Sequence, residues 1–323
     1  MNKKLVVLLA VLMVMLISVN STFAVNDPPR ITYVLPQVAN EIWSVAVEGF
    51  NTACDTYGFD CNVVAPTVPN DVSEMNSLIE IAIAEGVDGV MTQAVNAKGQ
   101  APAFKKLEEA GIMLALTNSD ANDSDISTFL GNIGTGSELG RIAGEQIVAA
   151  MDGEEIRVAT ALYSISAELA IKIHNAYLGA FEENAGGFEE KIVMDTRSDQ
   201  LHITEAYQNA FSTYPDINVA INVCGFAAPA AAKAVKEANL VGKVLIMGID
   251  DNLETLDGIR DGVIYGTMTQ NFFRMGYEPV MWFDTYFKTG EMPESKANDS
   301  GTLFVDMSNI DTYSADMKDP SKW

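Results

Sequence analysis

Short apolar runs rich in β-branched residues alternate with longer amphipathic segments along most of this chain. The apolar runs predict strands over residues 31–35, 61–65, 90–92, 112–116, 156–161, 191–194, 219–223, 244–248 and 265–269. Apolar side chains at helical spacing predict helices over residues 43–57, 72–85, 104–110, 167–183, 203–214, 229–239 and 252–258. Asp71 is placed to cap the second of these helices. This alternation is typical of βαβ units, in which helices cover both faces of a parallel sheet.

The βαβ pattern runs through the chain twice, with about five units in each run. A single sheet of about ten strands would be unusually wide, so the pattern favours an α/β protein with two similar doubly wound lobes. Residues 129–136 contain Gly131, Gly134 and Gly136, and glycine tolerates the backbone angles that a crossing between lobes needs. We therefore expect a crossing there, and a ligand cleft beyond the carboxyl ends of the strands.

The first 24 residues follow the pattern of a secretory signal peptide. Lys3 and Lys4 precede an apolar run over residues 5–19, and small residues around Ala24 provide a cleavage site. The run has about 15 residues, whereas a membrane-spanning helix needs about 20. It has no cysteine at its end for lipid attachment. We therefore expect cleavage after Ala24 and export to a periplasm, with an uncleaved membrane anchor as the alternative.

The chain is acidic, with a formal net charge of −24, which argues against nucleic acid or anionic lipid as a partner because both would be repelled. It contains only two histidines and no Cys-x-x-Cys pair, so we expect no metal site. Cys54 and Cys61 flank a predicted helix–turn–strand return, and an exported protein can form disulfides. Whether this pair is bonded stays open, and Cys224 would remain as a small, partly buried residue.

Polar and aromatic side chains cluster directly after the predicted strands, where ligands of parallel sheets bind. The clusters include Gln37, Asn40, Trp43, Gln93, Asn118, Tyr163, Phe226, Asp250 and Gln270. Amides and carboxylates hydrogen-bond to hydroxyl groups, and an aromatic ring packs on the C–H face of a sugar, so the mixture suits a neutral polyhydroxylated ligand. Three residues have structural alternatives: Trp43 in the core, Asn118 in a turn, and Asp250 as the cap of the next helix.

The chain lacks the motifs of several common enzyme classes, including the nucleophile elbow, the zinc-protease pair and the phosphate-binding loop. The glycines at 131, 134 and 136 do not follow the dinucleotide-binding order, and we expect no cofactor. Asp250 and Asp251 resemble a glycosidase carboxylate pair only superficially, because adjacent loop residues point in different directions. We therefore expect a binding protein without catalytic residues.

Four stretches of the chain follow a known pattern: residues 31–58, the Gly-Val-Asp-Gly-Val turn at 86–90, and the segments 247–250 and 266–270. Together they resemble the ribose/galactose-type periplasmic sugar-binding proteins, which are substrate-binding components of ABC transporters. The resemblance extends in order over about residues 30 to 300. It implies the type I periplasmic binding protein fold, with two lobes and a three-segment hinge.

The same resemblance divides the chain between the lobes. It implies an N-terminal lobe of residues 25–132 and 270–302, and a C-terminal lobe of residues 133–269 and 303–323. The hinge segments are expected near residues 130–134, 270 and 302–304.

Ligand contacts are also implied by the resemblance. The family's binding positions fall on Asn40, Trp43, Asn118, Asp250 and Gln270. An arginine that the family carries in a helix of the second lobe has no clear counterpart, and Asn175 and Tyr177 fall in that place.

Three positions depart from the family pattern. Ile42 replaces a second aromatic residue, Ser119 replaces a basic residue, and Cys224 replaces an asparagine whose contact is expected to move to Phe226. These changes remove groups that bind hydroxyls. They imply a ligand smaller, less polar or differently placed than ribose or galactose, such as a furanose, a deoxy or methylated sugar, a polyol, or a furanose-like signalling molecule.

The predicted function is the capture of a small neutral monosaccharide or polyol in the cleft between the lobes. A monomeric protein would then deliver the ligand to the membrane permease of an ABC importer. The lobes close because the ligand binds the closed form more tightly than the open form. One alternative is a sensor component that presents a sugar or furanose-like ligand to a chemoreceptor or histidine kinase, and a second is an enzyme on the same fold.

Overall fold

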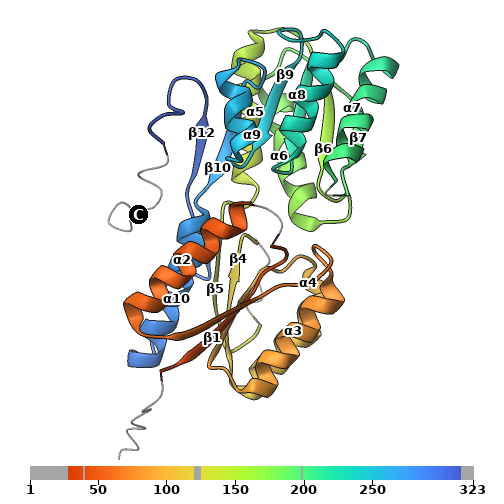
Figure 1. Cartoon of the computed structure of the whole chain (residues 1–323). Helices are drawn as coiled ribbons and strands as arrows, with labels where there is room; N and C mark the ends of the chain where they lie inside the picture. The colour runs from red at the N-terminus through yellow and green to blue at the C-terminus, as the bar shows by residue number, and fades with distance from the viewer. Residues whose placement is uncertain (1–27, 39–40, 120–124, 198, 314–323) are drawn as a thin grey trace, which may run out of the picture.

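The computed structural model describes residues 28–38, 41–119, 125–197 and 199–313, which form nine helices and twelve strands. The predicted signal peptide and Asn40 lie outside these residues. Two six-stranded sheets divide the described chain into two α/β lobes (Figure 1). Within the described ranges, no helix combines the length and the apolarity that a membrane crossing requires.

The first lobe is built on a sheet with the strand order β11-β5-β4-β3-β1-β2, in which all neighbouring strands run parallel. Its strands are β1 (Arg30–Val34), β2 (Asp60–Val64), β3 (Gly89–Thr92), β4 (Met113–Thr117), β5 (Phe129–Gly134) and β11 (Ala297–Asp299). The covering helices are α2 (Glu41–Tyr57) with α10 (Phe272–Thr289) and, on the other face, α3 (Val72–Glu85) with α4 (Ala97–Ala110). Each helix pair encloses its own apolar cluster against the sheet.

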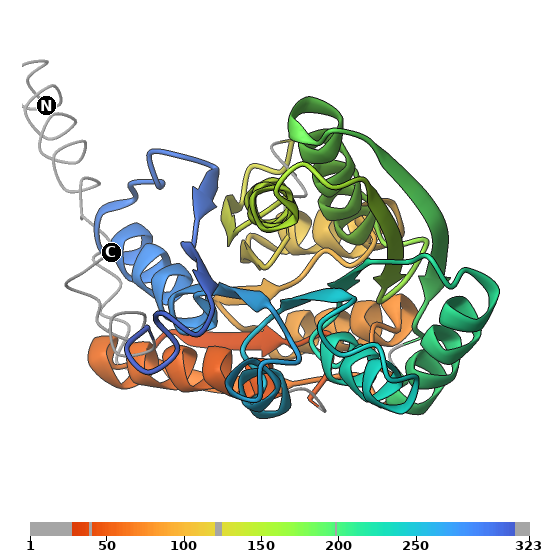
Figure 2. The ribbon, with the colours of Figure 1, turned by 90° about the horizontal axis from the view of Figure 1, so that it is seen from above.

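The second lobe repeats this plan with the strand order β12-β10-β9-β8-β6-β7. Its strands are β6 (Ile156–Leu162), β7 (Phe188–Asp195), β8 (Val219–Val223), β9 (Leu245–Ile249), β10 (Gly266–Gln270) and β12 (Thr302–Val305), which runs antiparallel to β10. The helices are α5 (Glu138–Met151) and α6 (Glu168–Asn184), then α7 (Gln200–Thr213), α8 (Ala227–Glu237) and α9 (Leu253–Arg260). Figure 2 shows α5 and α6 on one side of the strands and α7, α8 and α9 on the other, and each side encloses an apolar cluster.

The predicted fold class is confirmed, because both lobes are doubly wound sheets with the same order of strands, and all the strands except β12 run parallel. The chain passes between the two sheets after β5, after β10 and between β11 and β12. These three crossings form the hinge of the fold. The first crossing lies later in the chain than predicted. Residues 129–134 of the predicted crossing segment form strand β5, so the crossing begins after residue 134.

Local signals explain where several helices begin and end. The Asp71 carboxylate accepts a hydrogen bond of 2.9 Å from the backbone N–H of Glu74, and α3 ends at Gly86 with φ 68°. The predicted bounds of this helix, residues 72–85, are confirmed. The helix expected over 104–110 starts earlier, at Ala97, because the Asn96 side chain caps it.

Helices α2 and α10 approach so closely that two of their contact points have room only for glycine. A Cβ atom at Gly276 would lie 1.9 Å from the carbonyl oxygen of Ala46. A Cβ atom at Gly49 would lie 2.1 Å from the carbonyl oxygen of Phe273. This contact holds the starts of α2 and α10, which face the second lobe.

The cysteines take two different places. Cys54, in the last turn of α2, forms a disulfide with Cys61 of β2, and their Cα atoms lie 6.3 Å apart. Cys224 is a free, buried cysteine in the second lobe. In the described part of the chain, no group of three or more His, Cys, Asp or Glu residues is arranged to hold a metal ion.

The close helix contact predicts the effect of adding one methyl group. Gly276→Ala should lower the free energy of unfolding by about 1–3 kcal/mol, because the two helices must separate to make room. Chemical denaturation of the purified protein measures this change.

Gly179→Ala is the matched control. Gly179 also lies within a helix, α6, but an added Cβ would have no neighbour within 4 Å. This variant should keep or slightly raise stability, by up to about 1 kcal/mol. Equal effects of the two substitutions would contradict the packing argument.

Candidate functional site

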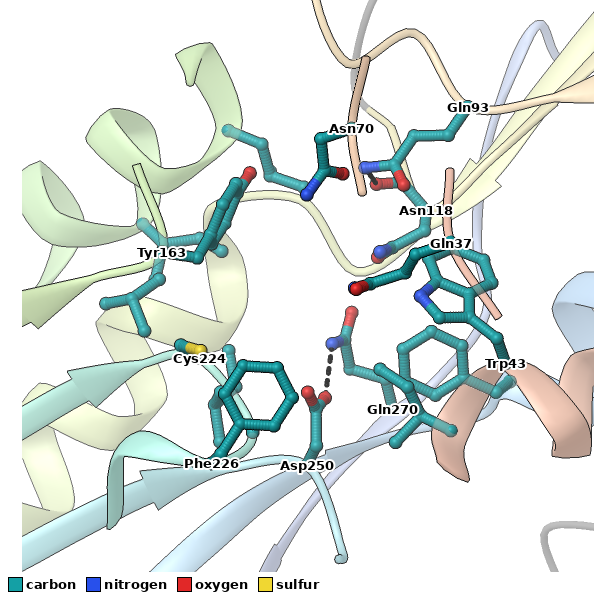
Figure 3. A pocket seen from close by; sticks show the side chains of 17 residues that line it. Gln37, Trp43, Asn70, Gln93, Asn118, Tyr163, Cys224, Phe226, Asp250 and Gln270 are labelled. Atoms are coloured by element: carbon teal, nitrogen blue, oxygen red, sulfur yellow. Dashed lines mark hydrogen bonds between the residues drawn. The ribbon is translucent and has the colours of Figure 1, made fainter. Parts of the chain in front are cut away.

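A cavity lies between the lobes, at the carboxyl ends of the strands of both sheets (Figure 3). It contains about 610 Å³ of space between atoms, part of it open solvent. Its polar lining consists of Gln37, Asn70, Gln93, Asn118, Tyr163, Asp250 and Gln270. Its apolar lining consists of Ile42, Trp43, Leu169, Ile173, Val223, Cys224, Phe226, Ile249 and Phe272. Among these described lining residues there is no lysine or arginine, and one carboxylate.

The polar side chains of the first lobe stand on loops that follow its strands. Asn70 and Asn118 adopt left-handed backbone angles, with φ 62° and 51°, which asparagine tolerates better than most residues. The Asn118 N–H donates to the carbonyl oxygen of Ile133 at 2.7 Å, and the Gln93 amide donates to the Asn118 carbonyl oxygen at 3.4 Å. Asn118 lies at a bend directly after β4, and its side chain also lines the cavity.

An aromatic pair forms the first-lobe side of the cavity. The rings of Trp43 and Phe272 meet edge to face, with centroids 5.5 Å apart and an interplanar angle of 70°. Trp43 is 3% exposed and belongs to the apolar cluster under α2 and α10, yet it also lines the cavity. Trp43 is therefore both a core residue and a cavity residue, because the apolar core extends to the cavity wall.

Asp250 is held by hydrogen bonds on its backbone and on its side chain. It follows β9 with φ 66°, its N–H donates to the Met268 carbonyl oxygen at 2.7 Å, and its own carbonyl accepts from the Thr267 hydroxyl at 2.7 Å. The Gln270 amide donates to the Asp250 carboxylate at 2.9 Å. The Gln270 side-chain oxygen accepts from the Thr135 hydroxyl at 2.7 Å. This chain of bonds links the carboxylate to two of the hinge crossings.

Burial changes the acidity of this carboxyl group. Asp250 is 5% exposed, and burial raises its pKa from 3.8 to about 7, although the Gln270 hydrogen bond lowers the pKa and the nearby charge of Asp251 raises it. The alternative that Asp250 caps the next helix is wrong, because α9 begins at Leu253 with Asn252 in the capping position. The Asp250 carboxyl group therefore lines the cavity without capping a helix, and its charge changes near neutral pH.

The structure brings most of the predicted ligand-binding residues to the cavity: Trp43, Gln93, Asn118, Phe226, Asp250 and Gln270. Asn40 lies outside the described residues.

Asn175 and Tyr177 are not in the cavity, contrary to the expectation. Helix α6 faces the cavity with Leu169 and Ile173, one turn apart. Tyr177 is one turn farther along the same face and lies fully buried in an apolar cluster. Asn175 lies on another face of the helix and is exposed.

One polar cavity residue, Asn70, was not anticipated. It precedes the helix cap Asp71, and its backbone N–H donates to the Pro36 carbonyl oxygen at 2.9 Å. The turn Pro69-Asn70-Asp71, which follows strand β2 and precedes α3, was the available signal. Four aliphatic cavity residues are also absent from the predicted site, because their sequence positions are typical of core residues: Leu169, Ile173, Val223 and Ile249.

The raised pKa of Asp250 predicts a pH-dependent stability. Between about pH 4 and 7 the folded protein holds this proton more tightly than the unfolded chain, so the free energy of unfolding falls as pH rises through that window. The slope from this group is at most about 1.4 kcal/mol per pH unit. Denaturation of wild type and Asp250→Asn at pH 5 to 8 measures it. The difference between them should fall up to about pH 7 and then level off; parallel curves would contradict the assigned pKa.

Two α/β lobes joined by a hinge, with a cavity between them, are the architecture of proteins that bind a small ligand between two lobes. The sequence model of the family described as "Periplasmic binding protein domain" matches residues 31–291. The chain therefore belongs to the periplasmic binding protein family.

Several known proteins are similar to this chain. The ABC transporter periplasmic-binding protein YphF of Escherichia coli is 23% identical over 216 residues, which are 64% of this chain and 64% of YphF, so the match spans less than two thirds of that relative. The galactofuranose-binding protein YtfQ of Escherichia coli is 24% identical over 233 residues, 69% of this chain and 71% of YtfQ. An ABC transporter solute-binding protein from Burkholderia graminis, solved in complex with D-arabinose, superposes with a TM-score of 0.80 at 23% identity, covering 89% of this chain and 98% of that one.

Proposed function

We propose that this chain is the solute-binding protein of an ABC importer and captures a small neutral monosaccharide or polyol between its lobes. The observation that carries the proposal is the interlobe cavity, whose described polar lining consists of amides, a phenol and one carboxylate, without lysine or arginine. Such a lining offers no cation to an anionic ligand, but it matches a ring of hydroxyl groups. The relatives named for galactofuranose binding and solved with D-arabinose support a sugar as the ligand.

The cavity residues are proposed to bind different parts of the sugar. The amides of Gln93 and Asn118 hydrogen-bond to hydroxyls, the Asp250 carboxylate accepts from one or two hydroxyls, and Trp43 packs on a C–H face of the ring. Asn40 remains a predicted contact from the loop before α2. Binding without turnover is the role that we propose, since the family consists of binding proteins.

Capture couples binding to closure of the hinge. We propose that the two lobes move as bodies against each other. The predicted bounds, residues 25–132 with 270–302 against residues 133–269 with 303–323, lie within two residues of the crossings that follow β5 and β10 and precede β12. A ligand held by both walls binds the closed form more tightly, and this difference in affinity shifts the hinge equilibrium. The closed form then docks on the membrane permease.

The proposed compartment is the periplasm, reached through the predicted signal peptide of residues 1–24. YphF is named as a transporter component and the Burkholderia protein as a transporter solute-binding protein. None of the three relatives is named as a sensor, so uptake is favoured over the sensor role.

A ligand screen on the chain without residues 1–24 tests the proposal. The protein is unfolded and refolded to remove carried ligand, then heated with pentoses, hexoses, deoxy sugars and polyols. A ligand at 100 times its Kd adds about 2.7 kcal/mol of stability, which is a measurable shift in Tm. No shift with any of these compounds would contradict the proposed ligand class.

With the ligand found, Trp43→Ala and Asp250→Ala test the site by titration calorimetry. Each should raise Kd by at least about 30-fold, or about 2 kcal/mol, because each removes a buried contact in the centre of the cavity. Asn175→Ala is the control, since Asn175 lies on α6 but outside the cavity and should leave Kd unchanged. An unchanged Kd in both cavity variants would place the site elsewhere.

A further inference from the structure

The two walls of the cavity differ in chemistry, and the difference restricts the ligand further than its neutrality does. The first-lobe wall carries four amide side chains: Gln37, Asn70, Gln93 and Asn118. The second-lobe wall carries an aliphatic patch, which consists of Leu169, Ile173, Val223 and Ile249. The part of a ligand that meets the patch must therefore be apolar, although Tyr163, Asp250 and Gln270 also give the second-lobe wall polar groups.

The aliphatic patch is part of a rigid framework. Leu169 and Ile173 lie one turn apart on α6, and Val223 and Ile249 end the neighbouring strands β8 and β9. Ile173, Val223 and Ile249 are 3%, 1% and 4% exposed and belong to one core cluster, against which Leu169 packs. Side chains held in this way cannot turn aside to admit a polar group, so the small surface that they present to the cavity is fixed and apolar.

The second lobe brings four side chains with hydrogen-bonding groups to the cavity: Tyr163, Cys224, Asp250 and Gln270. Asp250 and Gln270 bond to each other, and the Gln270 oxygen already accepts from Thr135. What they offer a ligand is the second carboxylate oxygen of Asp250 and one amide hydrogen of Gln270. The four patch side chains themselves offer a sugar hydroxyl no hydrogen-bond partner.

The aromatic residues suggest how the ring is oriented. Figure 3 shows Phe226 and Trp43 on opposite sides of the space into which the Gln37 side chain points. Aromatic rings pack on the C–H faces of a sugar, so this pair is placed to cover the two faces. The aliphatic patch then meets an edge of the ring, where the substituents are. A hydroxyl pressed against the patch would lose its water without gaining a partner.

On the basis of the proposed function, we propose that the ligand is a deoxy sugar. The edge that lacks a hydroxyl, or carries a methyl group in its place, contacts Leu169, Ile173, Val223 and Ile249. The remaining hydroxyls face the amides of the first lobe and the Asp250 carboxylate.

Matched pairs of sugars that differ by one hydroxyl test this inference by titration calorimetry. The pairs are galactose with 6-deoxygalactose, mannose with 6-deoxymannose, and ribose with 2-deoxyribose, each in D and L forms. In the pair that binds most tightly, the deoxy sugar should have a Kd at least tenfold lower than its parent, which corresponds to about 1.4 kcal/mol. A parent that binds as tightly as its deoxy partner, or more tightly, overturns the inference and leaves sugar binding standing. No binding by any member overturns the deoxy-sugar inference, and the wider screen of sugars and polyols then decides whether the proposed function also falls.

A substitution in the patch tests its role. Val223→Thr adds a hydroxyl at nearly constant volume and supplies a partner for the extra hydroxyl of the parent sugar. The preference for the deoxy sugar should fall at least threefold. Val193→Thr is the matched control, because Val193 is 40% exposed on β7 and lies outside the cavity, and it should keep the preference. An unchanged preference in Val223→Thr would overturn the assignment of the deoxy edge to the patch.

Discussion

The hydrogen-bonded chain from Thr135 through Gln270 to Asp250 is the constraint on which the cleft depends. Thr135 follows β5 at one crossing between the sheets, and Gln270 ends β10 at another. The Gln270 side chain is bonded through both its oxygen and its nitrogen, and the residue is 8% exposed, so its position is well determined. A rotation of the lobes that moves these two crossings relative to each other therefore also moves the Asp250 carboxylate in the cavity.

The cavity walls are continuous with the cores of the two lobes. Trp43 and Phe272 belong to the cluster that the close contact of α2 and α10 holds together. Ile173 and Ile249 belong to the cluster beneath α5 and α6. Side chains fixed by core packing need little further ordering when a ligand binds, and such preorganisation favours affinity. The fold therefore supplies the shape of the site, while the polar residues on the strand-end loops supply its chemistry.

Much of the fold could be predicted from local signals, whereas the site required the tertiary structure. The Asp71 cap and Gly86 mark the ends of α3 in the sequence itself. The strand-end rule likewise located Gln93 and Asp250, since it follows from parallel sheets in general. The rotation of α6 about its axis is not a local property, and the family resemblance places Tyr177 in the cavity although it packs in the core.

The proposed function requires the two lobes to close on the ligand, and small-angle X-ray scattering measures that closure. The radius of gyration of the refolded, ligand-free protein is compared with that of the same sample saturated with the tightest-binding sugar. The radius of gyration should be smaller with ligand, because both walls contact it and the hinge equilibrium shifts to the closed form. An identical radius with the site shown to be saturated would contradict capture by closure.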